Sequence, residues 1–422
     1  MRRIFSVLFL FTFINCFAQK LRTNYNEAAV PEYELPDLFE SFKGRKIKRS
    51  EQWEKIRRPE ILQLFTQEVY GKVPGVLEKP DVITYEASGD AFGGKAIRKQ
   101  FDLVFSVNNR ELSVGVLMYL PKTEGPVPVI VGYNFLGNHS IAGDVAIRIS
   151  ESWVNNNPSF GIVHNQFTEQ SRGYDAERWD VEKILDAGFG LVTLFYGDVD
   201  PDRDDFEDGV QPLLYKEGQE EPAPDEWRAM AAWSWGLSRV MDYLESDSDV
   251  NNEQVVVFGH SRLGKAALWA AASDQRFAAC ISNNSGCMGA ALSRRCFGET
   301  VAVVNRNFPQ WFCGNFKKYN GFEDRLPVDQ HMLLALIAPR PLYVGSASED
   351  LWADPKGEFL ATKIASSVYQ LYDIPGIVAV KMPEPEHPVG GVISYHLRTG
   401  KHGVTSYDWD QYLAWAKKYV VQ

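Results

Sequence analysis

Residues 255–272 read VVVFGHSRLGKAALWAAA: a β-branched apolar run, then Gly-His-Ser-Arg-Leu-Gly, then an alanine-rich stretch. This pattern is typical of a nucleophile elbow, in which a serine occupies a sharp turn between a buried strand and a helix. The hydroxyl is then exposed at the carboxyl edge of a sheet, beside the backbone donors of the helix N-terminus. Ser261 is therefore the candidate nucleophile. Because the spacing is G-x-S-x-x-G instead of G-x-S-x-G, a capping serine in an ordinary turn is the alternative.

Short apolar runs on both sides of the elbow predict the rest of the sheet. The segments that flank Asn108-Asn109-Arg110 alternate in polarity and predict an antiparallel hairpin. Continuous apolar runs, which indicate parallel strands buried on both faces, lie at 127–133, 190–196, 255–258, 278–282 and 342–346. Helical patterns separate them, at 225–245 with Asp225 as N-cap, 262–272, 328–337, 356–372 and 407–421. The sequence therefore predicts an α/β-hydrolase fold, a doubly wound, mostly parallel sheet between two layers of helices.

The N-terminus has the features of an export signal. Residues 1–18 combine a basic start, a short apolar run and a small-residue site, and predict a secretory signal peptide and not a membrane span. Cys16 raises a lipoprotein alternative, although the residues before it fit a lipidation site poorly. We expect a periplasmic or extracellular protein with an N-terminal extension over 19–60, packed on a single catalytic domain over 61–422.

The net charge and the cysteines indicate which partners, metals and cross-links to expect. The formal net charge of −11 argues against nucleic acid or an anionic membrane as partner. The acidic run 197–205 resembles a calcium loop, but Arg203 stands where such a loop needs glycine and the closing glutamate is missing. We therefore expect a solvated acidic loop, and neither a metal nor a cofactor. Four cysteines show no zinc spacing and are expected to be mostly buried apolar residues, with disulfide pairing left open: Cys280, Cys287, Cys296 and Cys313.

A serine nucleophile needs a histidine base, which in this fold follows it in the chain. His402 lies in a glycine-bracketed loop before the last predicted helix, where this fold places its base. His331 begins an apolar helix and is expected to pack. His387 lies between prolines and is expected in a surface loop.

The acid that orients the histidine is expected after the strand at 342–346. Three carboxylates compete there, and Asp350 or Glu349 at the mouth of the strand is favoured over Asp354. Asp354 precedes a proline and suits a turn or a helix N-cap.

Several long blocks, in order, carry a resemblance to a known family: GHSRLGKAALWAAA, NNSGCMGAALSRRCFGET, PQWFCGNFKKY, LPVDQHMLLALIAPRPLYV, SEDLWADPKGEF and YHLRTGKHGVTSYDW. Over residues 60–420 the chain resembles the bacterial glucuronoyl esterases, which hydrolyse esters of 4-O-methyl-glucuronic acid. The resemblance implies that Ser261 is the nucleophile, that His402 is the base and that Arg262 helps to hold the oxyanion. It also implies contacts with the sugar for three residues: Lys265, Glu299 and Trp352.

One position departs from the family. Many members carry a glutamate as triad acid 23 positions after the serine, where this chain has Asn284. An amide cannot carry the negative charge that stabilises an imidazolium. The acid is therefore expected to be Asp350, a site that the family also uses.

Together these features predict a secreted, monomeric serine esterase that cleaves glucuronate esters, as in lignin–xylan cross-links, through an acyl-enzyme. An acetyl xylan esterase or another carbohydrate esterase is one alternative, and a non-catalytic carbohydrate-binding protein is another. A cationic set favours a sugar acid over acetate, and Arg294 is expected to bind substrate with it: Arg262, Lys265, Arg294 and Arg295.

Overall fold

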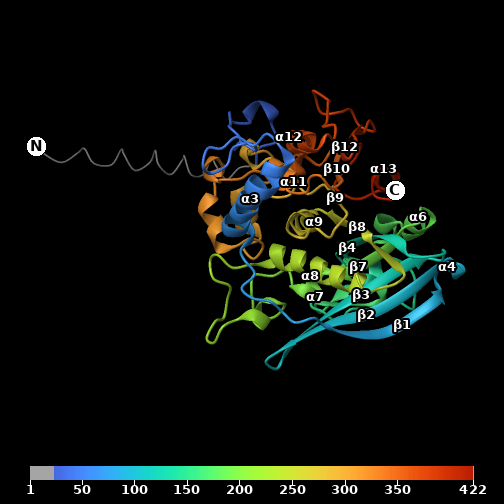
Figure 1. The fold of residues 1–422 in the computed structure, drawn as a ribbon. Coiled ribbons are helices and arrows are strands. Elements are labelled where there is room, and N and C mark those ends of the chain that lie inside the picture. The colour runs from blue at the N-terminus through green and yellow to red at the C-terminus, as the bar shows by residue number, and fades with distance from the viewer. Residues whose placement is uncertain (1–22, 422) are drawn as a thin grey trace, which may run out of the picture.

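The computed structural model describes residues 23–421, and ten strands of that part form one sheet (Figure 1). Its spatial order is β1-β2-β3-β7-β4-β8-β9-β10-β12-β11. The six strands from β7 to β12 in this order run parallel, and antiparallel strands complete both edges. The strands are β1 (Asp81–Asp90), β2 (Ala96–Val107), β3 (Arg110–Pro121), β4 (Val127–Asn134), β7 (Gly190–Phe195), β8 (Val250–His260), β9 (Ala279–Asn283), β10 (Leu342–Ala347), β11 (Val389–Gly390) and β12 (Ile393–Arg398). A separate small sheet pairs β5 (Ile162–Val163) with β6 (Gln166–Phe167).

Helices cover both faces of the large sheet, and a separate hydrophobic core lies between the sheet and the helices on each face. The first core includes apolar side chains of α3, α8, α9, α11 and α12, and the second includes those of α6 and α13 (Figure 1). The predicted doubly wound α/β-hydrolase architecture is confirmed. The helices are α2 (Ser50–Gln52), α3 (Arg58–Phe65), α4 (Ala91–Gly94), α5 (Ala176–Trp179), α6 (Val181–Asp186), α7 (Tyr196–Val199), α8 (Ala229–Leu244), α9 (Arg262–Ser273), α10 (Val301–Asn307), α11 (Gln330–Ala335), α12 (Pro355–Tyr369) and α13 (Ser406–Tyr419).

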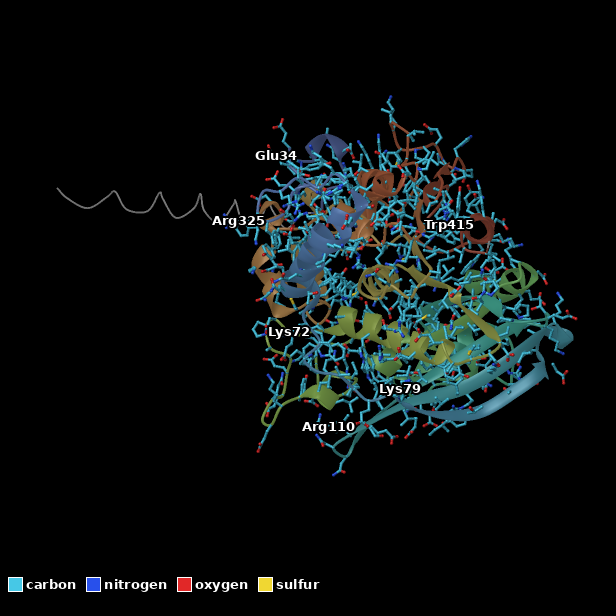
Figure 2. The ribbon with its side chains drawn as sticks, viewed as in Figure 1. Glu34, Lys72, Lys79, Arg110, Arg325 and Trp415 are labelled. Carbon is cyan, nitrogen blue, oxygen red and sulfur yellow. The ribbon has the colours of Figure 1, made fainter. Side chains whose placement is uncertain are left out.

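The predicted hairpin is confirmed as β2 and β3, which pair antiparallel with Val107 opposite Arg110. Arg110 lies at its turn (Figure 2). Because β3 runs antiparallel to β7, with Val116 opposite Leu194, the first half of β3 extends past the carboxyl end of β7. The hairpin therefore reaches the edge of the sheet at which the elbow lies.

The helix predicted over 225–245 starts later than expected, at Ala229, and Asp225 is not its N-cap. Asp225 instead forms an exposed ion pair with Lys72 at 2.6 Å. The backbone N–H of Ala229 donates to the carbonyl of Gln310 at 3.1 Å. A neighbouring loop thus satisfies a donor that a capping side chain would otherwise serve.

The acidic run 197–205 is solvated only at its end, where Asp204 is exposed, and its first part is not the solvated loop that the sequence predicts. Asp198, Asp200 and Asp202 are all buried. Each carboxylate accepts hydrogen bonds from nearby groups, as Asp200 does from Gln211 at 2.7 Å. Burial raises the pKa of Asp198 to about 6. Within residues 23–421 no three His, Cys, Asp or Glu side chains converge as a metal site would require.

Other packing predictions are confirmed. Cys280, Cys287 and Cys313 are buried free thiols, and burial raises the pKa of each. His331 is buried and His387 is exposed.

The described part of the N-terminal extension packs on the rest of the chain. The Arg58 guanidinium, at its end, donates to the carbonyls of Ala272 and Leu336 at 2.8 and 3.2 Å. The expected signal peptide, residues 1–18, lies outside the described residues, as does the cysteine of the lipoprotein alternative. None of the helices within 23–421 is long and apolar enough to cross a membrane.

Candidate active site

The elbow is built as the sequence pattern predicts. Ser261 joins β8 to α9 with φ 57° and ψ −130°, a conformation that side chains rarely adopt. The turn is so tight that a Cβ at Gly259 would lie 2.1 Å from the carbonyl oxygen of Leu263. The Ser261 N–H donates to the carbonyl of Asn283, at the end of β9, at 2.9 Å. Strand, turn and helix therefore hold the serine at the carboxyl edge of the sheet.

A cavity of about 80 Å³ opens at the elbow. Phe308 and Trp311, whose rings stack at 3.8 Å between centroids, form an aromatic wall. Six of the eight predicted site residues line this cavity: Ser261, Arg262, Lys265, Glu299, Trp352 and His402.

His402 and Asp350 form the histidine–acid pair. His402 Nδ1 lies 2.6 Å from Asp350 Oδ2, and the carboxylate is buried. Asn284, at the position of the alternative family acid, donates from Nδ2 to the same oxygen at 3.0 Å. The amide thus orients the acid in place of acting as one. No hydrogen bond joins Ser261 to His402 among the described residues, and such bonds often form only with substrate in place.

The other two candidate acids lie elsewhere. Glu349 is exposed. Asp354 caps α12 by accepting from the Gly357 N–H at 3.0 Å, and it pairs with Arg295 at 2.8 Å. The preference for Asp350 over both therefore agrees with the geometry.

A second histidine lies beside the first. The ring of His260 is 4.5 Å from that of His402, and its Nδ1 lies 2.7 Å from Asn283 Oδ1. Burial, together with the nearby His402, lowers the pKa of His260 well below its usual range. A neutral His260 does not repel a positive charge on the neighbouring His402.

Arg262 is held at the cavity by a buried carboxylate. Its guanidinium forms an ion pair with Asp202. The same carboxylate accepts from Gln310 Nε2 and Trp311 Nε1, both at 2.7 Å. The Arg262 side chain remains 28% exposed and lines the cavity.

Lys265 is fully engaged inside the protein. Its ammonium donates to the carbonyls of Ser285 and Cys287 at 2.9 and 2.7 Å and to Glu299 Oε2 at 2.7 Å. An ammonium has three donors, so none is left for a sugar hydroxyl. Lys265 is therefore placed to position Glu299, and its direct contact with the sugar stays a prediction.

Arg294 is not at the cavity, contrary to our expectation. It is buried, donates to the carbonyls of Leu326 and Val328, and pairs with Asp329 at 3.3 Å. These partners fix the loop before α11. The Arg294 guanidinium thus forms hydrogen bonds inside the protein and does not reach the cavity.

A buried acid supports the loop that carries Asn284. Glu358 accepts from the Gly286 N–H at 2.9 Å and from the Ser285 hydroxyl at 3.3 Å, and it also binds Ser346. Burial raises the pKa of Glu358 to about 8. These contacts hold the loop that carries Asn284 against α12.

The sequence interpretation missed several parts of the site. The sequence pattern assigns no role to Asp202, Phe308 or Trp311, although Trp311 lies in the block PQWFCGNFKKY and Phe308 directly precedes it. The extension also contributes, since the Asn24 carbonyl accepts from the Gly298 N–H at 2.8 Å, next to Glu299.

Comparisons with known proteins agree with this geometry. A family profile described as "Glucuronyl esterase, fungi" matches residues 221–373. Carbohydrate esterase MZ0003, from an unknown prokaryotic organism, is 49% identical over 402 residues, covering 95% of this chain and 93% of its own. The structure of a promiscuous CE15 esterase from a marine bacterial metagenome is 49% identical with a TM-score of 0.88, covering 94% of this chain and all of that one.

This chain belongs to the carbohydrate esterase family CE15. A glucuronoyl esterase from Solibacter usitatus is a further relative of known structure, 47% identical with a TM-score of 0.88, covering 93% of this chain and 99% of that one. The CE15 chain is accordingly a carboxylic ester hydrolase. Its elbow and its His402–Asp350 pair lie at the same cavity.

Proposed function

We propose that this CE15 enzyme is a serine esterase that cleaves esters of glucuronic acid, including the 4-O-methyl form, through an acyl-enzyme. The observation that carries the proposal is the single cavity at which the Ser261 elbow, the His402–Asp350 pair and the Arg262 guanidinium meet. The relative from Solibacter usitatus, named a glucuronoyl esterase, supports the substrate class.

The reaction follows from the positions of these groups. Ser261 Oγ attacks the ester carbonyl while His402 takes its proton, and Asp350 stabilises the imidazolium. Negative charge develops on the carbonyl oxygen, where the Arg262 guanidinium and backbone N–H groups of the elbow stabilise it. His402 then protonates the leaving alcohol. Water attacks the acyl-enzyme by the same route, which releases the acid and restores the serine.

The remaining cavity residues suit a hydroxylated ring. Glu299 offers a carboxylate, and the backbone N–H of Glu299 donates to the Trp352 carbonyl at 2.9 Å, which ties the two together. Trp352 is 37% exposed and offers an aromatic face. We propose that these two residues recognise the sugar and take no part in bond making.

Three esters measured side by side test the function: benzyl glucuronate, methyl galacturonate and an aryl acetate. We expect benzyl glucuronate to have the highest kcat/KM, because a site whose polar groups pair with substrate hydroxyls disfavours a substrate that lacks them. Faster turnover of the aryl acetate would favour the acetyl esterase alternative. Failure to turn over any ester would favour the non-catalytic alternative.

Substitution of the sugar-contact residues is expected to change substrate choice. We expect Glu299→Gln and Trp352→Ala to lower kcat/KM for benzyl glucuronate by about 10-fold or more, while the aryl acetate loses far less. Glu349→Gln, an exposed carboxylate near the same loop, is the control and should change neither rate. Equal losses on both substrates would instead assign Glu299 and Trp352 to loop architecture.

We further propose that the enzyme is exported, acts as a monomer and attacks the esters that link glucuronoxylan to lignin alcohols. A single chain supplies every catalytic and sugar-binding group named above, which supports a monomer. Removal of the expected signal peptide would leave all of these groups in the exported protein. The net charge of −11 disfavours nucleic acid as a partner.

A further inference from the structure

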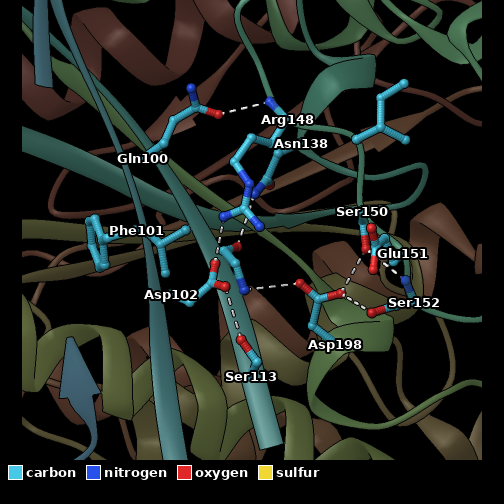
Figure 3. A pocket seen from close by; sticks show the side chains of 13 residues that line it. Gln100, Phe101, Asp102, Ser113, Asn138, Arg148, Ser150, Glu151, Ser152 and Asp198 are labelled. Carbon is cyan, nitrogen blue, oxygen red and sulfur yellow. Dashed lines mark hydrogen bonds and ion pairs between the residues drawn. The ribbon is translucent and has the colours of Figure 1, made fainter. Parts of the chain in front are cut away.

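A second cavity lies on the same edge of the sheet as the catalytic one. It has a volume of about 330 Å³ and is formed by β2, β3, the loop 148–152 and Asp198 (Figure 3). In the sheet, β3 is three strands from β8, after β4 and β7. At ordinary strand spacing this is a separation of about 14 Å. The volume is within the range of small-ligand sites.

Two carboxylates with neighbouring donors form the walls of this cavity. Asp198 accepts from the Gly115 N–H at 3.1 Å and from the hydroxyls of Ser150 and Ser152 at 3.1 and 2.6 Å (Figure 3). These donors fix the carboxylate, so this wall of the cavity is preorganised.

Asp102, on the other side, accepts from the Ser113 hydroxyl at 3.0 Å and pairs with Arg148 at 3.2 Å (Figure 3). The Arg148 guanidinium lies 3.5 Å from the centroid of the Tyr85 ring, and about half of its side chain is exposed. A guanidinium has five N–H donors, and only one of those of Arg148 is used on Asp102.

This mixture of groups selects the class of ligand. An anion would meet the carboxylates of Asp102, Glu151 and Asp198, and an apolar ligand would leave polar groups unpaired. A cation would meet the Arg148 guanidinium, which is half exposed beside Asp102. A neutral ring with several hydroxyl groups can both accept from Arg148 and donate to the carboxylates. A neutral pyranose fits this requirement.

The cavity adjoins a second hollow on the same edge of the sheet. A neighbouring hollow of about 430 Å³ shares Ser113, Ser152 and Asp198 with it and is lined by Trp153. Four residues after Asp198, the same segment carries Asp202, the partner of Arg262. The segment that follows β7 thus contributes Asp198 to this cavity and Asp202 to the support of Arg262 at the catalytic one.

We propose that the cavity around Asp102, Arg148 and Asp198 is a secondary binding site for a neutral pyranose residue of the polysaccharide that carries the ester. This inference rests on the proposed function, since it names a more distant part of the same substrate. Occupancy of the site holds the polymer while an esterified side group enters the catalytic cavity. It contributes nothing to the hydrolysis of small esters.

The test compares a polymer with a small ester. Arg148→Ala is expected to lower kcat/KM on esterified glucuronoxylan by about 10-fold, the effect of losing one to two hydrogen bonds to a charged group, and to leave benzyl glucuronate unchanged. Arg239→Ala is the matched control, because Arg239 also has one aspartate partner and one ring contact, with Trp235 on α8. It should change neither rate. Thermal unfolding checks that both variants are folded.

Direct binding distinguishes this proposal from the proposed function. Unesterified xylohexaose is titrated into the wild type, Arg148→Ala and Asp102→Asn, and both substitutions are expected to weaken binding while Arg239→Ala does not. The secondary site would be overturned if xylohexaose bound equally to all four proteins. It would also be overturned if Arg148→Ala lowered kcat/KM equally on the polymer and on the small ester. A wild type that binds xylohexaose but does not hydrolyse benzyl glucuronate would overturn only the proposed function.

Discussion

Ser261→Ala is expected to abolish ester hydrolysis in a protein that remains folded. The substitution removes one hydroxyl, and the triad as a unit supplies about 10⁴-fold or more of the rate. The strained φ of 57° costs alanine about as much as serine, so the elbow should persist. Steady-state hydrolysis of benzyl glucuronate measures the loss, and circular dichroism with thermal unfolding shows that the fold is kept.

The control for this result uses a second member of the triad. His402→Ala should lose as much activity as Ser261→Ala, and the double variant should lose no more, because the two act as one unit. His387→Ala, at an exposed histidine outside the cavity, should keep the wild-type rate. Wild-type rates in a folded Ser261→Ala protein would contradict a serine mechanism.

The parts of the fold that the sequence predicts are those with local signals. The strands β4, β7, β8, β9 and β10 contain short apolar runs because both faces of this part of the sheet are covered by helices. The strand β12 lacks such a run, since Ser394, His396 and Arg398 alternate along it and are nevertheless buried. Asp408 of α13 makes this burial possible by binding His396 Nε2 at 2.9 Å and Arg398 Nε at 2.7 Å. A charged partner on the next helix is invisible to a rule based on apolar periodicity, even ten or twelve residues along the chain.

The same distinction separates the site residues. Ser261, Asp350 and His402 lie at the carboxyl ends of strands or in the loops that follow them, so the known chain order of this fold finds them. Whether Lys265 has a free donor depends on carbonyl groups of a distant loop, which no motif records. Arg294 illustrates the same limit, because its partners belong to the segment before α11.

Asp350→Asn is expected to lower kcat by about 10⁴-fold with little change in KM, the effect of removing the acid from a triad. The carboxylate 2.6 Å from His402 Nδ1 fixes the tautomer and stabilises the imidazolium, and an amide does neither reliably. Kinetics on benzyl glucuronate give the two constants. Glu349→Gln is the control and should leave kcat and KM unchanged. A loss of kcat in Glu349→Gln, together with an unchanged kcat in Asp350→Asn, would reverse the assignment.

Asn284 allows a sharper test of the same acid. In the wild type, Asn284→Glu would place a second carboxylate near Asp350, where Asn284 Nδ2 now lies 3.0 Å from Oδ2, and two such charges disfavour each other. We therefore expect this variant to be slower than the wild type. In the Asp350→Asn protein the same Asn284→Glu change should instead raise kcat, because a carboxylate returns to the neighbourhood of His402. A change in the same direction in both backgrounds would mean that Asn284 acts on the loop and not through the charge of the acid.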